Sequence, residues 1–320
     1  MNRRYAVTGG AGFIGSALVR GLLRDGAEKV TVIDNFLSGS EKNLGEVRDR
    51  IAVARVDIRD YESLLPAMQG ADIVFHLAAI PSVPRSILEP VPSHEVNING
   101  TFNVLRAAAE SGVKRVVYAA SSSAYGDTDV LPKVESMAPR PKSPYAVQKL
   151  LGEHYISVFA SCFGLEGVAL RFFNVYGPRQ DPSSAYSGVL SKFMTALLSG
   201  QSPMIHGDGT QTRDFTYVED VVGLILKASN TSGVSGNVYN AGNGNRYSLN
   251  EVWAALQKIE GVNLPQVYGP WRDGDVRDSQ ADTTRAVREL GHKPQFTLEE
   301  GLRRTLEWYR ADQQAAVEAR

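Results

Sequence analysis

The sequence contains a single cysteine, Cys162, among 320 residues. One thiol cannot form an intrachain disulfide, and it cannot supply a cysteine-rich zinc site. Because Phe163 follows it in a segment with helical periodicity, we expect Cys162 to be a small buried residue rather than a nucleophile. No metal site is predicted.

Long apolar runs and an excess of one charge are also missing. No run approaches the roughly 20 residues that a membrane helix needs, and the apolar stretch Tyr5–Thr8 is too short for a signal-peptide core. Lys and Arg number 34 against 35 Asp and Glu, so the net charge is -1. Such a chain has no basic field that attracts nucleic acid or an anionic membrane, although a local cationic pocket is compatible with it. We expect a cytoplasmic protein that binds neither.

What remains is the composition of a folded protein, with 43% hydrophobic and 22% charged residues. In the first 120 residues, runs rich in Val, Ile and Ala alternate with segments of helical periodicity. This pattern is typical of parallel strands buried between helices. It predicts an α/β fold with a Rossmann-like, doubly wound parallel sheet. The expected strands are Tyr5–Thr8, Val30–Ile33, Ile51–Val56, Ile73–Leu77 and Val116–Ala120, and the expected helices lie near Phe13–Asp25, Tyr61–Gln69 and Val96–Ser111.

The second half of the chain has a different residue pattern. Pro, Gly and Ser interrupt residues 126–144 and 176–188, and loops of that length are usually functional or disordered. We divide the chain into a Rossmann domain (1–174) and a smaller C-terminal α/β lobe (175–320), some segments of which return to the main sheet. The lobe is expected to hold helices at Val189–Leu198, Val218–Ser229 and Leu249–Ile259, and its polar end, residues 310–320, to be partly disordered.

A glycine-rich turn joins the first expected strand to the first helix. Gly9, Gly12 and Gly15 stand in it. One glycine makes the tight turn, one lets the backbone approach a pyrophosphate, and one lets the helix pack closely on the strand. The helix that begins with Phe13 and Ile14 offers free N–H groups and the positive end of its dipole to the phosphates. The turn therefore predicts a dinucleotide site, with a purely structural turn as the competing interpretation.

The ends of the next strands carry residues that suit a dinucleotide. Asp34 ends the second strand, where a carboxylate accepts hydrogen bonds from the adenine ribose and repels a 2′-phosphate, which favours NAD over NADP. Asp57-Ile58 would lie near the adenine, and Leu77-Ala78-Ala79 would let the cofactor approach the backbone. A structural role competes at Asp57. We expect His76 to be a buried histidine with no catalytic role.

Candidate catalytic residues follow the fifth strand. Ser121-Ser122-Ser123 comes directly after it, and Tyr145 and Lys149 lie four residues apart in a segment that Pro144 opens, so they share one helix face. A Lys ammonium and an oxidised nicotinamide both favour the phenolate, which lowers the pKa of the tyrosine from about 10 toward working pH, as a general base requires. Ser121 can hydrogen-bond the same substrate hydroxyl.

Together with the glycine turn, this set resembles the extended short-chain dehydrogenase/reductase superfamily over essentially the whole chain. The resemblance implies that Ser121, Tyr145 and Lys149 are catalytic and that Tyr145 and Lys149 also contact the cofactor. It implies an NAD site formed by Gly9, Gly12, Phe13, Ile14, Gly15, Asp34, Asn35, Ser38, Asp57, Ile58, Leu77, Ala78, Ala79 and Asn97.

The serine loop indicates which of the reactions in this superfamily the chain catalyses. Related dehydratases carry Thr-Asp-Glu where this chain has Ser121-Ser122-Ser123, and related decarboxylases usually place a Glu in this loop. Serines cannot supply that extra acid–base pair at neutral pH, whereas a C4 epimerase needs only one base. Further segments look like nucleotide-sugar 4-epimerases, especially the UDP-N-acetylglucosamine branch: Pro81–Ser86, Leu131–Glu135, Arg171–Gly177, Arg179–Pro182, Ala185–Val189, Gly207–Gly209, Arg213–Tyr217 and Gly274–Ser279.

The same resemblance implies a sugar-nucleotide site. Arg213 and Arg272 would clamp the diphosphate, as guanidinium forks suit phosphate, with a plain surface role competing for each. Ser279 falls where some epimerases specific for non-acetylated sugars carry Tyr, and a small residue leaves room for a 2-acetamido group. Phe172 stands where many members have Tyr beside the nicotinamide. The other implied substrate contacts are Ser82, Ser123, Tyr145, Asn174, Gly188 and Val189.

We therefore expect an NAD-dependent enzyme that epimerises C4 of a UDP-hexose through a 4-keto intermediate. UDP-N-acetylglucosamine is the expected substrate, with UDP-glucose as a further candidate. The alternatives are a UDP-glucuronate 4-epimerase, a nucleotide-4-ketosugar reductase and a non-catalytic NAD-binding scaffold. The resemblance also implies a homodimer formed through the helices near Val96–Ser111 and Tyr145–Phe163, although the apolar residues of these helices could equally belong to the core.

Overall fold

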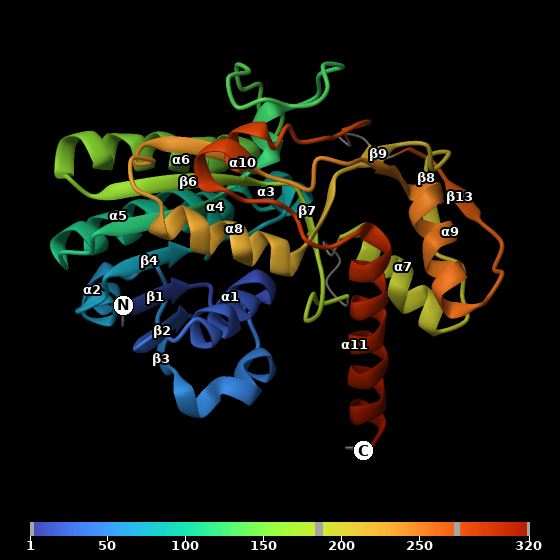
Figure 1. Cartoon of the computed structure of the whole chain (residues 1–320), viewed down its shortest axis with the longest axis horizontal. Coiled ribbons are helices and arrows are strands. Elements are labelled where there is room, and N and C mark those ends of the chain that lie inside the picture. Colours follow the sequence, from blue (N-terminus) through green and yellow to red (C-terminus); the bar gives the residue numbers. More distant parts are fainter. Residues whose placement is uncertain (1–2, 183–187, 272–275, 319–320) are drawn as a thin grey trace.

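A seven-stranded parallel sheet forms the centre of the molecule (Figure 1). The computed structural model describes residues 3–182, 188–271 and 276–318. Within them the strands lie in the order β11-β6-β5-β4-β1-β2-β3, which reverses at β1 and β4 as in doubly wound sheets. The predicted fold class is confirmed, and the five expected strands end within one residue of their predicted limits. The bounds are β1 Arg4–Thr8, β2 Lys29–Asp34, β3 Ala52–Arg55, β4 Ile73–His76, β5 Arg115–Ser121, β6 Glu166–Phe172 and β11 Asn237–Ala241.

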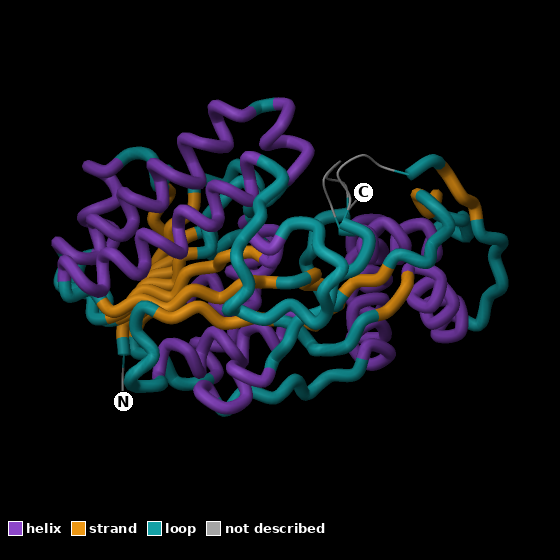
Figure 2. The backbone as a smooth tube through the Cα atoms, turned by 90° about the horizontal axis from the view of Figure 1, so that it is seen from above, coloured by secondary structure: helices purple, strands orange, loops and turns teal. Residues whose placement is uncertain are grey.

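Helices cover both faces of the sheet, as Figure 2 shows. Successive side chains of a strand point to opposite faces, so Val7 packs into one core and Ala6 into the other. Both faces are therefore buried, and apolar residues dominate the middle of the strands. One face holds α1 (Phe13–Arg24) and α8 (Val218–Asn230), and the other holds α2 (Tyr61–Met68), α5 (Thr101–Glu110) and α6 (Pro144–Phe163).

Helix α6 begins sharply, because Pro144 is its first residue and the Ser143 hydroxyl accepts a hydrogen bond from the Ala146 N–H at 3.2 Å.

Short helical elements follow the carboxyl ends of several strands. The 3₁₀ helices η1 (Glu41–Arg50) and η3 (Ser122–Tyr125) follow β2 and β5. After β4 come α3 (Val83–Leu88), α4 (Pro90–His94) and the π-helical turn η2 (Glu95–Gly100), which leads into α5.

A smaller group of elements lies beside the sheet, at the right of Figure 1. Helices α7 (Val189–Leu198), α9 (Leu249–Glu260) and α11 (Leu298–Glu318) pack on one another. Three two-stranded pairs accompany them: β7 Asn174–Tyr176 with β10 Phe215–Tyr217, β8 Met204–His206 with β13 Val267–Gly269, and β9 Thr212–Arg213 with β12 Tyr247–Ser248. Strand β11 pairs with β6, and α10 (Thr284–Leu290) contacts β11 and α8. The domain boundary at residue 174 stays a prediction.

Two expectations about exposure and order are wrong. Cys162 is exposed, because the last turn of α6 leaves residues 161–163 uncovered. Residues 310–318 continue helix α11, and the burial of Leu302, Leu306 and Tyr309 shows that one face of this helix packs onto the protein. Among the described residues, no helix is long and apolar enough to cross a membrane.

Candidate active site

The glycine turn between β1 and α1 is a tight backbone cradle. Gly9 has a φ of +70°, and a Cβ built on it would lie 2.7 Å from the Ala78 backbone nitrogen. A Cβ on Gly15 would lie 2.1 Å from the Gly9 carbonyl oxygen. Gly12 precedes α1 and has no side chain to cap it, so the first N–H groups of the helix face the turn. This geometry fits a bound pyrophosphate.

Asp34 is held rigidly at the end of β2. Its Oδ2 accepts a hydrogen bond from the Ala11 N–H at 2.9 Å, and its Oδ1 accepts one from the Phe36 N–H at 2.8 Å. A carboxylate has about four acceptor positions, so its two oxygens can still receive ribose hydroxyls. The hydrogen bond from Ala11 ties the glycine turn to β2, and the predicted NAD residue therefore also shapes the turn.

The expected adenine side of the site is polar and organised by a residue that we did not predict. Arg59 donates to both carboxylate oxygens of Asp57, at 3.0 and 2.8 Å, and Asn35 donates to Asp57 Oδ2 at 2.8 Å. The hydrogen bonds from Arg59 are the main cause that holds the pKa of Asp57 at about 2. Ile58 is buried, whereas Asn35 and Ser38 are exposed. The Asp-x-Arg spacing is a signal that could have identified Arg59.

Strand β4 ends beside this cradle. The two ring nitrogens of His76 lie 2.8 Å from Thr8 Oγ1 and 3.0 Å from Thr101 Oγ1, and burial lowers the pKa of His76 to about 3. The expectation of a satisfied buried histidine is confirmed. Leu77, Ala78 and Ala79 follow His76, all partly exposed.

Asn97 lies in η2, fully enclosed by the protein. Its Oδ1 accepts a hydrogen bond from the Ile80 N–H at 2.8 Å, and its Nδ2 donates to the Ile80 carbonyl and to Gln148 Oε1. The side chain thus joins the loop after β4 to helix α6. The Asn97 side chain is therefore engaged by Ile80 and Gln148, and its contact with the cofactor stays a prediction.

The three candidate catalytic residues meet where β5 ends and α6 begins. Tyr145 is hydrogen-bonded to Ser121 through its side chain, and its backbone N–H donates to Ser86 Oγ at 3.1 Å. Lys149 Nζ donates to the Ala119 carbonyl at 2.8 Å. Strand, helix and the loop after β4 therefore hold the tyrosine from three sides.

Burial dominates the electrostatics of this group. It raises the pKa of Tyr145 to about 12, while the hydrogen bond with Ser121 acts in the opposite direction. Burial also lowers the pKa of Lys149 to about 7, against the attraction of Glu153. The predicted fall in the tyrosine pKa is therefore not a property of the chain by itself. The positive charge that Lys149 can offer the phenolate therefore depends on Glu153, which acts against the effect of burial.

The other substrate candidates come from four elements of the structure. Ser123 donates to Ser121 Oγ through both its N–H, at 3.2 Å, and its hydroxyl, at 2.8 Å. Ser82 is buried, and its Oγ accepts a hydrogen bond from the Arg85 N–H at the start of α3. Asn174 opens β7 with an exposed side chain. Gly188 precedes α7, and Val189 is the first residue of that helix.

A strap formed by residues 276–282 reaches this region from the C-terminal part of the chain. Ala281 packs against Tyr125 and Phe173, which lie two residues from Ser123 and one residue from Asn174. Ser279 donates its N–H to the Thr212 carbonyl at 3.1 Å. The structure thus brings the Ser279 segment to the serine loop. Arg272 lies outside the described residues.

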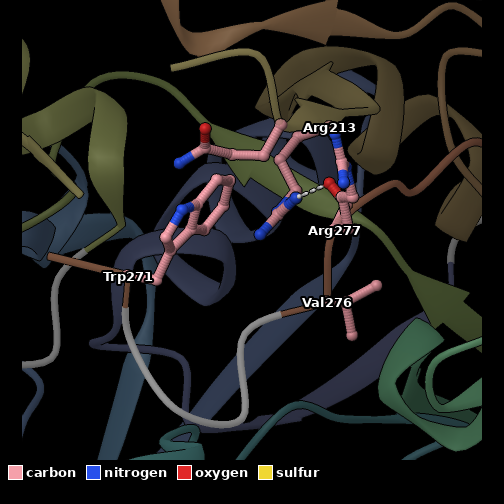
Figure 3. Close-up of a pocket in the computed structure, with 5 residues that line it drawn as sticks. Arg213, Trp271, Val276 and Arg277 are labelled. Atoms are coloured by element: carbon pink, nitrogen blue, oxygen red, sulfur yellow. Dashed lines mark hydrogen bonds between the residues drawn. The ribbon is translucent and has the colours of Figure 1, made fainter. Parts of the chain in front are cut away.

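Arg213 borders a cavity of about 160 Å³ in the smaller group of elements (Figure 3). Its Nη1 donates to the carbonyls of Thr212 and Arg277, both at 2.9 Å, and these bonds fix the guanidinium. The cavity is also lined by Gln211, Trp271, Val276 and Arg277, none of which was predicted as a site residue. An aromatic residue directly before Arg272, which the resemblance already implied as a phosphate contact, was the available signal for Trp271.

A glycine cradle at the switch point of a parallel sheet, with a Tyr, Lys and Ser group beside it, defines a dinucleotide-dependent enzyme of the extended short-chain dehydrogenase/reductase class. The chain belongs to the NAD dependent epimerase/dehydratase family, whose sequence model matches residues 5–242. It is 40% identical over 311 residues to UDP-glucose 4-epimerase of Mycolicibacterium smegmatis, and the match covers 96% of this chain and 98% of that protein.

Solved structures agree with this assignment. UDP-N-acetylglucosamine 4-epimerase of Methanobrevibacter ruminantium, in complex with UDP-N-acetylmuramic acid, is 36% identical and superposes with a TM-score of 0.92 over 97% of this chain and 99% of that one. UDP-glucose 4-epimerase of Thermus thermophilus, in complex with NAD, is also 36% identical, with a TM-score of 0.87 over 96% and 99% of the two chains.

Proposed function

We propose that this NAD-dependent UDP-sugar 4-epimerase interconverts UDP-N-acetylglucosamine and UDP-N-acetylgalactosamine and also accepts UDP-glucose and UDP-galactose. The placement of the strap carries the proposal. Ala281 packs against Tyr125 and Phe173 near Ser123 and Asn174, and Ser279 lies two residues before Ala281 in the same strap. We therefore assign the small side chain of Ser279 to the sugar end of the site. A small residue on this side of the sugar leaves volume for a 2-acetamido group.

The proposed chemistry needs one proton acceptor. Tyr145 takes the O4 proton of the sugar, Ser121 orients that hydroxyl through its hydrogen bond, and Lys149 stabilises the phenolate. NAD, when bound, accepts the C4 hydride and returns it. Loss of a proton from O4 and a hydride from C4 leaves a 4-keto sugar, and the reverse transfer to the other face of the ring gives the epimer. Tyr145 then returns the proton that it took.

The serine loop favours epimerisation over the other reaction in the family description. Dehydration removes a hydroxyl from a neighbouring carbon and requires a further acid–base pair. Ser122 and Ser123 cannot supply one, and Ser123 is already engaged with Ser121. The described side chains around Tyr145 thus support a single-base mechanism.

Arg213 and its cavity are the proposed nucleotide end of the site. The guanidinium, fixed on two backbone carbonyls, presents a positive charge to the diphosphate, and Arg272 is expected to act with it. The half-exposed Trp271 offers an aromatic face to the uracil ring.

Three separate incubations test the proposed substrate. The purified protein is given UDP-N-acetylglucosamine, UDP-glucose or UDP-glucuronate without added cofactor, and the products are separated by anion-exchange chromatography. We expect the C4 epimer of the first two. A product from UDP-glucuronate alone would establish the glucuronate alternative, a need for stoichiometric NAD(P)H would indicate a reductase, and bound NAD without any turnover would indicate a scaffold.

A pair of variants tests the specificity argument. Ser279→Tyr fills the proposed acetamido space, so kcat/KM for UDP-N-acetylglucosamine should fall about tenfold or more, while the value for UDP-glucose should change little. Ser279→Ala keeps the space and is the matched control, for which we expect both values to stay near wild type. Equal losses for both sugars in Ser279→Tyr would contradict the assignment of Ser279.

A further inference from the structure

An ion pair that the proposed reaction does not use lies beneath the catalytic helix. Glu153 is one turn after Lys149 in α6 and accepts two hydrogen bonds from Arg171 in β6, Nε to Oε1 at 2.9 Å and Nη2 to Oε2 at 2.8 Å. Each side chain is only 4% exposed. A bidentate pair at this depth is strongly oriented, but the loss of hydration makes such pairs weak sources of stability. The Glu153–Arg171 pair is therefore expected to contribute something other than stability to the protein.

Few other groups hold Arg171. Its Cζ lies 4.5 Å from the centre of the Tyr125 ring, and Tyr125 in turn donates to Asn240 Oδ1 at 2.6 Å. Arg171 Nη1 is buried and has no hydrogen-bond acceptor among the described residues. Glu153 is thus the one carboxylate paired with Arg171, and loss of either partner would leave an unbalanced buried charge.

Lys149 has close ionisable neighbours on three other elements. Its Nζ lies 4.9 Å from the ring centre of Tyr118 in β5, and the neutral His76 in β4 also faces it. On its own helix Tyr145 precedes it and Glu153 follows it, and Arg171 in β6 lies behind Glu153. Of these groups, Glu153 is the one carboxylate. Burial lowers the pKa of Lys149 to about 7, and Glu153 is the influence that raises it.

We propose that Glu153 and Arg171 form one positioning unit for the catalytic centre, in which Arg171 holds the buried Glu153 carboxylate in place and the charge of that carboxylate keeps Lys149 protonated next to Tyr145. Neither residue touches the reacting atoms. The inference rests on the proposed function, because it explains how Lys149 keeps the positive charge that stabilises the phenolate.

The pH dependence of kcat for epimerisation tests the unit. Activity should be lost as the pH rises through the pKa at which Lys149 loses its proton. Glu153→Gln removes the attracting charge and leaves Arg171 unopposed, so the alkaline limb should move to lower pH by about one unit or more. KM should change little, because neither residue contacts the substrate.

The double variant Glu153→Gln/Arg171→Met separates charge from packing. It removes both charges and keeps similar volumes, so its alkaline limb should return part of the way toward wild type. A purely structural pair would give the opposite result, since losing two buried groups disturbs packing more than losing one. An alkaline limb of the double variant at or below that of Glu153→Gln would overturn the proposal.

A second ion pair, which joins β6 to β5 rather than to α6, provides a control. Arg115 Nη2 lies 2.6 Å from Glu166 Oε2, and these residues face each other at the start of β5 and β6, five positions, or about 17 Å, before Arg171. Glu166→Gln should leave the alkaline limb at its wild-type position. A shift as large as that of Glu153→Gln would show that loss of any ion pair on β6 has this effect, and it would also overturn the proposal.

A measurement without turnover keeps this inference separate from the proposed function. Acetic anhydride reacts only with the neutral amine, so labelling of Lys149 against pH, read by peptide mass, reports its protonation in the absence of substrate. The midpoint should fall in Glu153→Gln, and an unchanged midpoint would refute the unit even if epimerisation is confirmed. If no UDP-sugar is turned over, the proposed function fails, but the labelling still shows whether Glu153 keeps Lys149 protonated. Should Glu153→Gln not fold, the double variant is compared with wild type, and an equal midpoint would refute the proposal.

Discussion

At the residue scale, the proposed chemistry depends on the hydroxyl of Tyr145. Its backbone is held by Ser86 and its side chain by Ser121, so the phenol is positioned by neighbours rather than by its own helix alone. Burial that raises its pKa to about 12 opposes ionisation. The positive charges of Lys149 and of bound NAD must therefore act during the reaction.

Removal of that hydroxyl provides the first prediction. Tyr145→Phe should lower kcat by about 10² to 10⁴, the usual contribution of a general base, while the thermal midpoint and the bound NAD stay near wild type, because only one oxygen is lost. Steady-state rates, thermal melts and NAD released on denaturation check this. Val147→Ala, a change at an exposed residue of the same helix, is the control and should leave kcat nearly unchanged. Near-normal turnover in Tyr145→Phe would remove the tyrosine from its role.

At the scale of elements, we expect the turn between β1 and α1 to determine whether a dinucleotide can bind. A methyl group on Gly15 would lie 2.1 Å from the Gly9 carbonyl oxygen, a distance that forces the backbone to move. The turn that presents N–H groups to the phosphates would open, and its hydrogen bond to Asp34 would be strained.

The second prediction follows from this contact. Gly15→Ala should be purified with little or no NAD, and added NAD should bind at least about tenfold more weakly, as measured by calorimetry. Gly45→Ala is the matched control, since nothing lies within 4 Å of a Cβ built there. If Gly15→Ala retains NAD at the wild-type level, the turn is not the phosphate site.

Helices α5 and α6 also leave an apolar surface uncovered. Phe102 in α5 and Val147, Leu151 and Val158 in α6 are exposed, and residues four apart on a helix share a face. These side chains agree with the predicted homodimer, in which the same surface of a second copy would cover them.

The third prediction concerns this surface. We expect the protein to sediment as a dimer and Leu151→Glu to shift it toward monomer, because a charge would be buried at the interface. Val262→Glu, at an exposed apolar residue after α9, is the control and should remain dimeric. Wild-type protein that sediments as a monomer at micromolar concentration would contradict the predicted homodimer.

At the scale of the whole molecule, two buried histidines link stability to pH. Burial lowers the pKa of His76 to about 3 and that of His292 to about 4, whereas an unfolded histidine titrates near 6.5. Between these values the unfolded chain binds more protons than the folded one. The free energy of unfolding contributed by each histidine is therefore intact above pH 6.5 and falls as the pH decreases through this window.

The fourth prediction concerns the slope of the free energy of unfolding against pH. Each histidine should reduce the free energy of unfolding by up to about 1.4 kcal/mol per pH unit below 6.5, which urea titrations at pH 7.5, 6.0 and 5.0 would show. His292→Gln should make the decline shallower, and replacement of the exposed His154 by Gln should not. An unchanged slope in His292→Gln would show that His292 is not buried in its neutral form.

Much of the fold and the cofactor site was open to prediction from local patterns. Short apolar runs located β1 to β5, because strands buried on both faces need apolar residues at every position. Asp34 and the glycines were identified because the chemistry of a phosphate turn restricts residue type within a few positions. The ion pair Glu153–Arg171, the brace of Arg59 on Asp57 and the cavity beside Trp271 were not predicted. Each joins residues from separate segments, and no local pattern records which strand will lie against which helix.

The sequence by itself determined the doubly wound sheet, the phosphate turn and the Tyr145–Lys149 spacing, since each follows from periodicity or backbone sterics within one segment. Its lone cysteine excluded disulfides, and its balanced charge gave no bulk attraction to nucleic acid. Only the tertiary structure decided that Cys162 is exposed, that the Ser279 strap reaches the serine loop, and that burial governs the pKa values of Tyr145 and Lys149. Exposure and desolvation depend on which surfaces pack together, and that packing is a property of the whole chain.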